Sequence, residues 1–226
     1  AVRLAWQAYD AGVDALIIQD MGLLTEELPP LEIHASTQCD IRTPKKAAFL
    51  DNLGFNQIVL ARELTLEEIR RCREAMARAR IEFFVHGALC VSYSGRCYLS
   101  CAETGRSANR GACAQPCRLP YSVFDRDGRE LAHRKHVLSL MDNDQSGNLE
   151  ALVDAGVTSF KIEGRLKDAA YVKNITAYYR QKLDDLIRRR QADGWHSESL
   201  GNTTFTFTPD PCRTFHRGAT DYFVNR

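Results

Sequence analysis

Short apolar runs alternate with amphipathic segments along most of the chain, and this alternation is the strongest constraint on its fold. Apolar runs of strand length predict buried β-strands at residues 15–19, 31–36, 57–61, 82–86, 137–140 and 159–162. Helical apolar spacing and capping residues predict helices at residues 2–11, 23–28, 44–53, 65–80, 149–155 and 169–190. Strands and helices that alternate in this way form right-handed parallel βαβ units, so the sequence predicts an α/β fold.

The number of predicted strands points to an incomplete barrel. Six parallel strands are two fewer than a TIM-type (β/α)8 barrel contains, and the chain starts in a helix that leads into a strand. We therefore predict a (β/α)8 barrel that lacks its first units, with a doubly wound sheet as the alternative. The partial barrel spans residues 1–190 and carries an insertion at about residues 88–132. Residues 191–226 are predicted to form an irregular extension with a short strand at 205–207.

A glycine-rich loop after the fourth predicted strand holds five of the chain's eight cysteines, which are Cys90, Cys97, Cys101, Cys113 and Cys117. A β-hairpin with Asp127-Gly128 at its turn is predicted to follow them. Five thiols within 28 residues indicate a metal site, because thiolates bind zinc and iron–sulfur clusters. Zinc sites use close pairs of cysteines, so the irregular spacing favours an iron–sulfur cluster. Disulfides and buried structural cysteines are the alternatives, and Cys39 and Cys72 are expected to be structural.

The bulk composition limits the kinds of partner. The chain has 30 Lys and Arg residues against 29 Asp and Glu, a net charge of +1, so any surface that binds RNA must be local. No apolar run in the sequence approaches the roughly 20 residues of a membrane-spanning helix. We expect a cytoplasmic protein, in which thiols stay reduced and free to bind metal.

Polar side chains follow the predicted strands at their carboxyl ends, where parallel α/β folds place their active sites. In chain order these candidates are Asp20, His34, Ser36, Gln38, Arg62, Glu63, His86, Asp142, Lys161, Glu163 and Arg165. Several also have a structural interpretation. Either histidine can be a hydrogen-bonded core residue, and Glu163 and Arg165 can form an ordinary salt bridge. The cysteine loop begins directly after His86, and this proximity favours a functional site.

Three motifs resemble those of the collagenase-like peptidase family, U32. Glu82-x-Phe84-x-x-Gly87-Ala88-Leu89-Cys90-x-x-x-x-Gly95-x-Cys97-x-Leu99-Ser100 is similar to the family signature. Lys161-Ile162-Glu163-Gly164-Arg165 and His34-Ala35-Ser36-Thr37-Gln38 resemble two further motifs in the family's order. The resemblance implies the barrel fold without its N-terminal segment. It also implies a hydroxylase with a four-iron (4Fe-4S) cluster that acts on transfer RNA, ribosomal RNA or ubiquinone precursors.

The resemblance narrows the substrate and assigns residues. Residues 97–121 most resemble the ribosomal RNA enzymes, which implies 5-hydroxylation of a cytidine in large-subunit ribosomal RNA with prephenate as co-substrate. The implied cluster ligands are Cys90 and Cys97 of the signature with Cys113 and Cys117, and Cys101 is in reserve. The catalytic candidates are His34, Gln38, His86, Glu163 and Arg165. Arg62 and Lys161 are the candidates for cofactor binding, and Arg62 and Arg165 could bind the carboxylates of prephenate.

Three other functions fit the same residues. Hydroxylation of a uridine in transfer RNA would use the same motifs. A cysteine peptidase, the activity in the family's name, would use Cys90 beside His86, and the sequence has no HExxH motif for a metallopeptidase. A zinc-stapled scaffold that binds RNA without catalysis would use the aromatic and cationic residues of the loop, which are Tyr93, Tyr98, Tyr121, Arg96, Arg106, Arg110 and Arg118.

Overall fold

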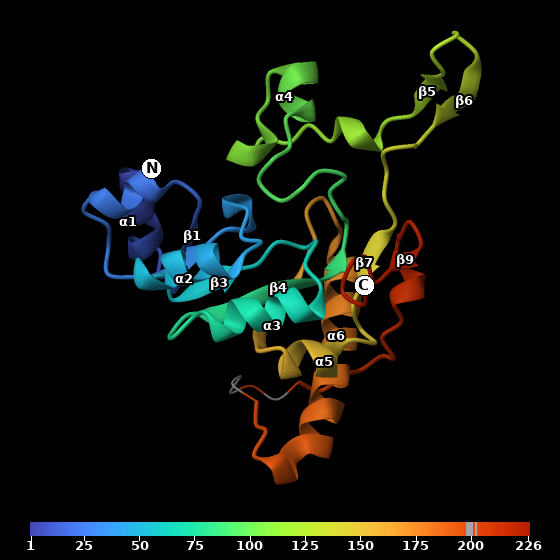
Figure 1. Cartoon of the computed structure of the whole chain (residues 1–226). Helices are drawn as coiled ribbons and strands as arrows, with labels where there is room; N and C mark the ends of the chain where they lie inside the picture. Colours follow the sequence, from blue (N-terminus) through green and yellow to red (C-terminus); the bar gives the residue numbers. More distant parts are fainter. Residues whose placement is uncertain (198–200, 202) are drawn as a thin grey trace.

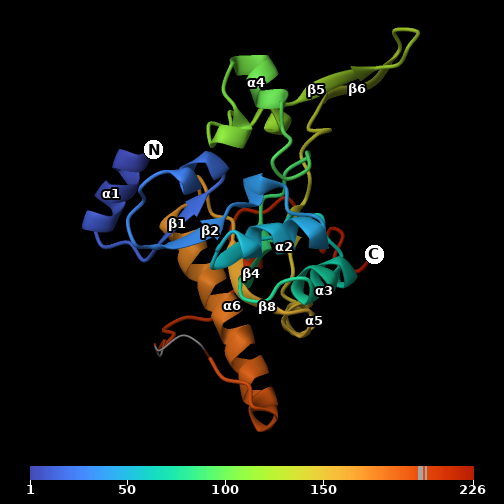
Figure 2. The same ribbon diagram turned by 60° about the vertical axis from the view of Figure 1, so that its left-hand side comes forward.

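The computed structural model describes residues 1–197, 201 and 203–226, and a mixed β-sheet forms its centre (Figures 1 and 2). Five strands of this sheet lie parallel to one another in the order β1-β2-β3-β4-β8. They are β1 (Ala15–Ile18), β2 (Glu32–Ala35), β3 (Gln57–Val59), β4 (Arg80–Gly87) and β8 (Val157–Ile162). Every residue of β4 after Arg80 is buried, because strands flank it on both sides. The predicted parallel α/β sheet is confirmed for these five strands.

Four helices pack their apolar faces against this sheet and form one core with it. They are α2 (Pro44–Asn52), α3 (Leu66–Glu74), α5 (Leu149–Asp154) and α6 (Ala169–Arg190). Helix α1 (Val2–Asp10) adds no residue to that core, and Ala5 is its one buried residue. Ile69, Leu152 and Ile175 of three different helices are all fully buried in that core. The cap of α3 follows from its sequence, because Thr65 and Glu68 form a reciprocal capping box. No helix in the described parts of the chain is both long and apolar enough to span a bilayer.

A single carboxylate fixes the connection between α3 and β4. Asp51 of α2 is 2% exposed and accepts hydrogen bonds from the backbone N–H groups of Ala77 (2.7 Å), Arg78 (3.2 Å) and Ala79 (2.7 Å). Burial opposes ionisation of this carboxyl, but the three donors outweigh burial and lower the pKa of Asp51. The ionised side chain is therefore part of the folded structure.

We expect Asp51→Asn to lower the free energy of unfolding by about 2–3 kcal/mol at neutral pH, because an amide offers one acceptor oxygen where the carboxylate offers two. The pKa of Asp51 is lower in the folded chain, so its contribution is complete above the unfolded pKa and is lost as the pH falls through the folded pKa. Urea unfolding should therefore show that the difference in unfolding free energy between wild type and Asp51→Asn becomes smaller from about pH 7 to about pH 3. Asp154→Asn, at an exposed ion pair with Arg190, is the control with little effect. An equal gap at both pH values would contradict this account.

The strand predicted at residues 137–140 is wrong in place and direction. Residues 137–140 form no strand, and β7 (Asp142–Asp144) follows them instead and pairs antiparallel with the end of β4. Asp142 and Asn143 of β7 are polar but buried. Hydrogen bonds to β4 compensate for this burial, because Asn143 Nδ2 donates to the carbonyl oxygen of Phe84 at 2.9 Å and the backbone N–H of Gln145 donates to the carbonyl oxygen of Val85. β9 (Ala219–Thr220) pairs parallel with β7 at the end of the sheet. The described sheet is therefore mixed, and it does not confirm a (β/α)8 barrel.

Three smaller predictions also differ from the structure. The helix predicted at 23–28 is a 3₁₀ helix at Met21–Thr25, which Asp20 caps by accepting a hydrogen bond from Gly22. The helix predicted at 65–80 ends at Glu74, and β4 begins at Arg80. Residues 205–207 form no strand, and Phe207 lies under the ammonium of Lys173 instead.

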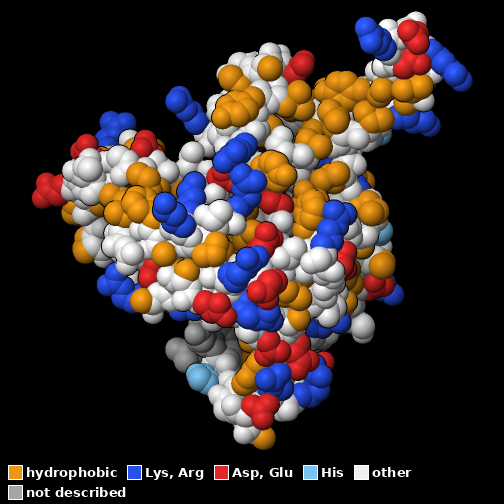
Figure 3. All heavy atoms as spheres, viewed as in Figure 1, with side chains coloured by type: hydrophobic (Ala, Val, Ile, Leu, Met, Phe, Trp, Pro, Cys, Tyr) orange, Lys and Arg blue, Asp and Glu red, His pale blue; other side chains and the backbone are white. Residues whose placement is uncertain are grey.

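Residues 88–141 leave the sheet after β4 and return to it at β7, and we call them the cysteine arm. The arm contains α4 (Leu99–Thr104) and the hairpin of β5 (Tyr121–Phe124) and β6 (Glu130–Lys135), which confirms the predicted hairpin. Both ribbon views show the arm standing away from the sheet (Figures 1 and 2). On the face seen in Figure 3, the hairpin exposes hydrophobic side chains along its length and charged ones at its tip.

Candidate active site

A cavity of about 660 Å³ lies between the cysteine arm and the carboxyl ends of the strands. Four of the arm's cysteines line it, and the fifth does not: Cys101 is exposed and lines a neighbouring cleft. The four that line the cavity are Cys90, Cys97, Cys113 and Cys117. Gln38, Arg62, Glu163 and Arg165 line the same cavity. Eleven residues are predicted as catalytic, cofactor-binding or metal-binding, and the structure thus brings eight of them to one cavity.

Two glycines allow the arm to approach the rim of the sheet. Gly87 has φ +100°, and a Cβ there would lie 2.5 Å from the carbonyl oxygen of Glu163. Gly95 has φ +74°, and a Cβ there would lie 2.3 Å from the carbonyl oxygen of Gln38. Both positions therefore require glycine for conformation and for space. Ser94 fixes the same turn, because its N–H and hydroxyl both donate to the carboxylate of Glu63, at 2.9 Å and 3.0 Å.

Hydrogen bonds within the arm position the remaining cysteines. The N–H of Cys97 donates to Asn109 Oδ1 at 3.0 Å, and the N–H of Ala114 donates to Ser100 Oγ at 2.8 Å. The sulfur of Cys113 accepts a hydrogen bond from the N–H of Gln115 at 3.3 Å. The first two of these contacts hold residues 109–114 of the cysteine loop against residues 97–100.

The electrostatics of the thiols reflect burial opposed by nearby arginines. Burial raises the pKa of Cys90, and Arg62 lowers it in part; burial raises the pKa of Cys117, and Arg118 opposes that shift. Cys117 lies within electrostatic range of the other three cavity cysteines. Among the described residues, however, no three His, Cys, Asp or Glu side chains converge closely enough to bind one metal ion as they stand. The thiols are spread around the cavity.

Cationic side chains dominate the remaining wall of the cavity, and they are Arg62, Arg118, Arg165, Lys167, Arg213 and Arg217, against the acidic Glu163 and Asp168. Some already have partners. Arg217 pairs with Asp142 at 3.2 Å, and Lys167 Nζ donates to the carbonyl oxygen of Phe215 at 3.1 Å. Arg118 donates to Ser139 Oγ and to the carbonyl oxygen of Leu89.

Arg62 has hydrogen-bonding capacity to spare. Its guanidinium lies over the ring of Phe84 at 4.0 Å, and its Nη2 is 3.7 Å from Glu163 Oε2. Its Nε is buried and has no hydrogen-bond partner among the described residues. A buried N–H without an acceptor is costly, so this group favours an anion or a polar ligand in the cavity.

The full length of the chain, residues 1–226, matches the sequence model of peptidase family U32. The chain belongs to peptidase family U32. It is 61% identical over 225 residues to the 23S rRNA 5-hydroxycytidine C2501 synthase of Escherichia coli K12, a match that covers 100% of this chain and 34% of that protein. It is 35% identical over 184 residues to tRNA hydroxylation protein P1 of Bacillus subtilis 168, covering 77% of this chain and 43% of that protein.

Other relatives carry collagenase or peptidase names. The chain is 37% identical over 191 residues to a collagenase of Porphyromonas gingivalis, covering 78% of this chain and 46% of that protein. A solved U32 peptidase structure aligns with a TM-score of 0.37 at 20% identity, over 61% of this chain and 56% of that one. The U32 chain described here spans about a third to a half of the length of the curated relatives it matches.

Three of the predicted site residues of this U32 chain do not line the cavity. His34 Nε2 lies 3.1 Å from Glu32 Oε2 on the same strand, and the ammonium of Lys161 pairs with Glu82 Oε1 at 2.7 Å. His86 is buried, its Nδ1 lies 3.2 Å from the hydroxyl of Tyr179, and burial lowers its pKa. All three side chains face β-strand or helix neighbours, so we interpret them as supports of the sheet.

The C-terminal segment supplies cavity residues that the sequence did not indicate. Arg213, Thr214, Phe215 and Arg217 all line the cavity. The pairing of β9 with β7 and the Arg217–Asp142 ion pair hold this segment beside the U32 motifs. The one available signal was the cluster of Arg213, His216 and Arg217, and it carries no periodicity from which a fold position can be predicted.

The geometry does not favour a cysteine peptidase. A nucleophilic cysteine needs a lowered pKa and a histidine that faces it. Burial raises the pKa of Cys90, and the Nδ1 of His86 is engaged with Tyr179. Cys90 and His86 therefore do not form the activated nucleophile and base that a cysteine peptidase requires.

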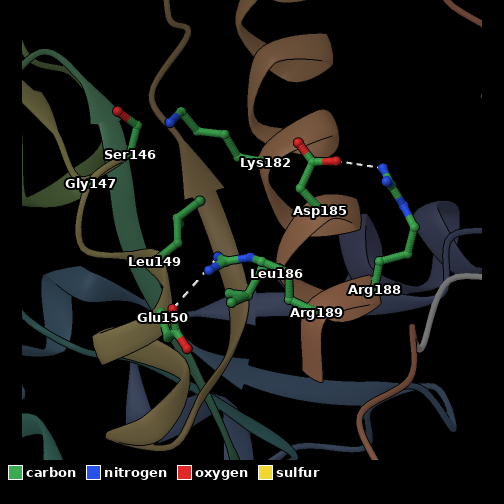
Figure 4. A pocket seen from close by; sticks show the side chains of 9 residues that line it. All are labelled: Ser146, Gly147, Leu149, Glu150, Lys182, Asp185, Leu186, Arg188 and Arg189. Atoms are coloured by element: carbon green, nitrogen blue, oxygen red, sulfur yellow. Dashed lines mark hydrogen bonds and ion pairs between the residues drawn. The ribbon is translucent and has the colours of Figure 1, made fainter. Parts of the chain in front are cut away.

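A separate cavity of about 700 Å³ lies between α5 and α6 (Figure 4). Two of its cations pair with carboxylates, since Arg188 pairs with Asp185 and Arg189 lies 3.6 Å from Glu150. No cysteine lines this cavity. We assign it no part in the chemistry of the U32 site.

Proposed function

We propose that this chain forms the catalytic core of an RNA hydroxylase that converts a cytidine of large-subunit ribosomal RNA to 5-hydroxycytidine. The observation that carries the proposal is the 61% identity, over the whole chain, to the C2501 synthase. The B. subtilis relative named for transfer RNA hydroxylation makes a transfer RNA uridine the alternative substrate. Both relatives are named for the hydroxylation of RNA, and the name of the first gives a cytosine base as the modified group.

The donor set of the cavity fits a 4Fe-4S cluster. Such a cluster takes four thiolates, one on each iron, so its ligands stand around it, whereas zinc draws its ligands to one point at about 2.3 Å. Cys90, Cys97, Cys113 and Cys117 surround one cavity, and Arg62 and Arg118 lie close enough to offset negative charge on the thiolates. When bound, a cluster would supply electron transfer at this site. Zinc is the alternative metal.

The co-substrate we propose is prephenate, whose two carboxylates suit the arginines of the cavity wall. Arg62 has a buried Nε without a partner, and the guanidinium of Arg165 makes no hydrogen bond or ion pair among the described residues. Guanidinium groups bind carboxylates through paired N–H donors. Gln38 and Glu163, on the same wall, are the polar groups left to orient the nucleobase, and a carboxylate can accept a hydrogen bond from the cytosine amino group.

We also propose that the five parallel strands are part of a (β/α)8 barrel. In the described residues β1 has a strand neighbour on one side only, and Ile17 of β1 is 53% exposed. The relatives are two to three times longer than this chain. A (β/α)8 barrel would continue with further parallel strands beside β1 and cover this edge.

The proposal is tested by deleting the gene that encodes this chain and analysing ribosomal and transfer RNA nucleosides by mass spectrometry. We expect 5-hydroxycytidine to disappear from the large-subunit RNA and to return when the intact gene is supplied. Anaerobically purified gene product should contain about four iron and four sulfide ions per chain. Unchanged 5-hydroxycytidine would refute the proposal, and loss of a transfer RNA nucleoside instead would move the activity to the alternative substrate.

A further inference from the structure

A second cleft, of about 1350 Å³, lies beside the cysteine cavity. One wall is the carboxyl ends of β1 and β2 with the 3₁₀ helix Met21–Thr25, and the other wall is the cysteine arm around α4. Gln38 and Gly111 line both the cleft and the cavity. A molecule that lies along the cleft therefore reaches the cavity at these two residues.

The seven aromatic and cationic side chains of residues 90–121, the cysteine loop of the arm, divide into two groups. Most of them are engaged within the protein. The guanidinium of Arg42 covers the ring of Tyr93 at 4.4 Å, Arg96 Nε lies 2.6 Å from Asp40 Oδ2, and Arg106 Nε donates to the carbonyl oxygen of Ala112 at 3.1 Å. Tyr121 donates to the carbonyl oxygen of Pro116 at 2.9 Å, and Arg118 is bonded as described above. These five side chains support the arm's own fold.

Tyr98 and Arg110 form the second group. Both are exposed, both line the cleft, and neither side chain has a hydrogen bond, ion pair or ring contact with another described residue. Tyr98 is 71% exposed, although its ring has an apolar face that a folded protein normally covers. The opposite wall offers Ile17, Ile18, Met21 and Leu23, which provide an apolar surface of the kind that nucleobases contact. The acid of that wall, Asp20, is engaged in capping Gly22.

We propose that this cleft binds the single-stranded RNA that flanks the target nucleotide, with a base stacked on Tyr98 and a phosphate bound by Arg110. The proposal rests on the proposed function for its choice of ligand. An exposed aromatic ring and an unpaired guanidinium in one cleft suit single-stranded nucleic acid, because its bases are free to stack and its phosphates carry the charge. Duplex RNA does not present base faces, so the cleft selects unpaired nucleotides.

The test measures the affinity of the full-length gene product for a fluorescein-labelled single-stranded RNA with one central cytidine, by fluorescence anisotropy. Tyr98→Ala should weaken binding about 5- to 150-fold, as the loss of one stacked base does, and Tyr98→Phe should bind within about twofold of wild type. Arg110→Ala should weaken binding and lower the slope of log affinity against log salt by about 0.7, the value for one phosphate contact to a single strand. Arg126→Ala, at the exposed hairpin tip, is the matched control.

Iron content is measured on every variant, so that a weaker affinity is scored only for protein with wild-type iron. Equal affinities of wild type, Tyr98→Ala and Arg110→Ala would overturn the inference, as would equal binding of the same sequence in duplex form. Nucleoside analysis separates this inference from the proposed function. If the RNA affinity depends on Tyr98 but no cytidine is hydroxylated in cells, the cleft is confirmed and the proposed reaction is wrong. If cytidine hydroxylation is confirmed and Tyr98→Ala binds RNA normally, only the proposed RNA-binding role of the cleft is wrong.

Discussion

Replacing Cys117 with Ser is expected to remove the iron from the anaerobically purified protein, whereas replacing Cys101 with Ser should leave the iron in place. Cys117 lines the cavity with Cys90, Cys97 and Cys113, and Cys101 is exposed in the neighbouring cleft. A serine hydroxyl ionises far less readily than a thiol and is a poor ligand for iron, so the site loses one of four thiolates. We expect iron to fall from about four ions per chain to below about one, with loss of cytidine hydroxylation.

The measurement is iron and sulfide analysis together with the visible absorbance of the cluster, repeated for Ser substitutions at Cys90, Cys97 and Cys113. All four cavity variants should behave alike. Loss of iron in Cys101→Ser with retention in Cys117→Ser would make Cys101 the ligand and would require the arm to rearrange on binding. One equivalent of zinc in the wild-type protein, without iron, would show that the cysteines bind zinc and not an iron–sulfur cluster.

Gly95→Ala should have the second large effect, because it acts on both the conformation and the position of the arm. An alanine at φ +74° is strained, and its Cβ would lie 2.3 Å from the carbonyl oxygen of Gln38, a backbone atom that cannot turn aside. Strain at a left-handed position costs about 1–2 kcal/mol, and displacing backbone from backbone adds to it, so we expect a total loss of about 3–4 kcal/mol. The displaced arm should also hold less iron.

Gly105→Ala is a matched control for that substitution. Gly105 has φ +71°, close to the value at Gly95, but a Cβ there meets nothing within 4 Å. It should therefore show the conformational strain alone, about 1–2 kcal/mol, with the iron retained. Thermal or urea unfolding of both variants, with iron analysis, separates the two contributions. Equal losses of stability for the two variants would show that the contact with Gln38 is unimportant.

Most of the sheet was predictable because its strands are apolar and buried. Ile58, Phe83 and Val85 lie in apolar runs that are visible in the sequence, and each is at most 1% exposed. β7 was not predictable, since Asp142, Asn143 and Asp144 resemble a loop. Their polarity is tolerated because the backbone and side chain of Asn143 bond to β4, a contact between residues 59 apart. Such long-range satisfaction of polar groups leaves no local pattern.

The candidate site was predictable in its cysteines and less so in its other members. The placement of four thiols around one cavity agrees with the predicted set, and their role as ligands stays a prediction. His34 and Lys161 lie within β2 and β8, near the carboxyl ends of these strands, but each has a nearby carboxylate that the sequence does not reveal as its partner. Arg213 and Arg217 reach the cavity only because β9 pairs with β7, more than seventy residues away in the sequence.

The antiparallel pairing of β7 with β4 also bears on how such proteins diverge. Because His86 pairs with Asp144 and Gly87 with Asn143, the cysteine arm starts and finishes at adjacent backbone positions. The entropy cost of closing a loop between fixed neighbouring ends grows only slowly with its length. An arm anchored in this way can lengthen, shorten or change its sequence while β1 to β4 keep their register. Evolution can therefore fit different arms to differently shaped substrates on one unchanged platform.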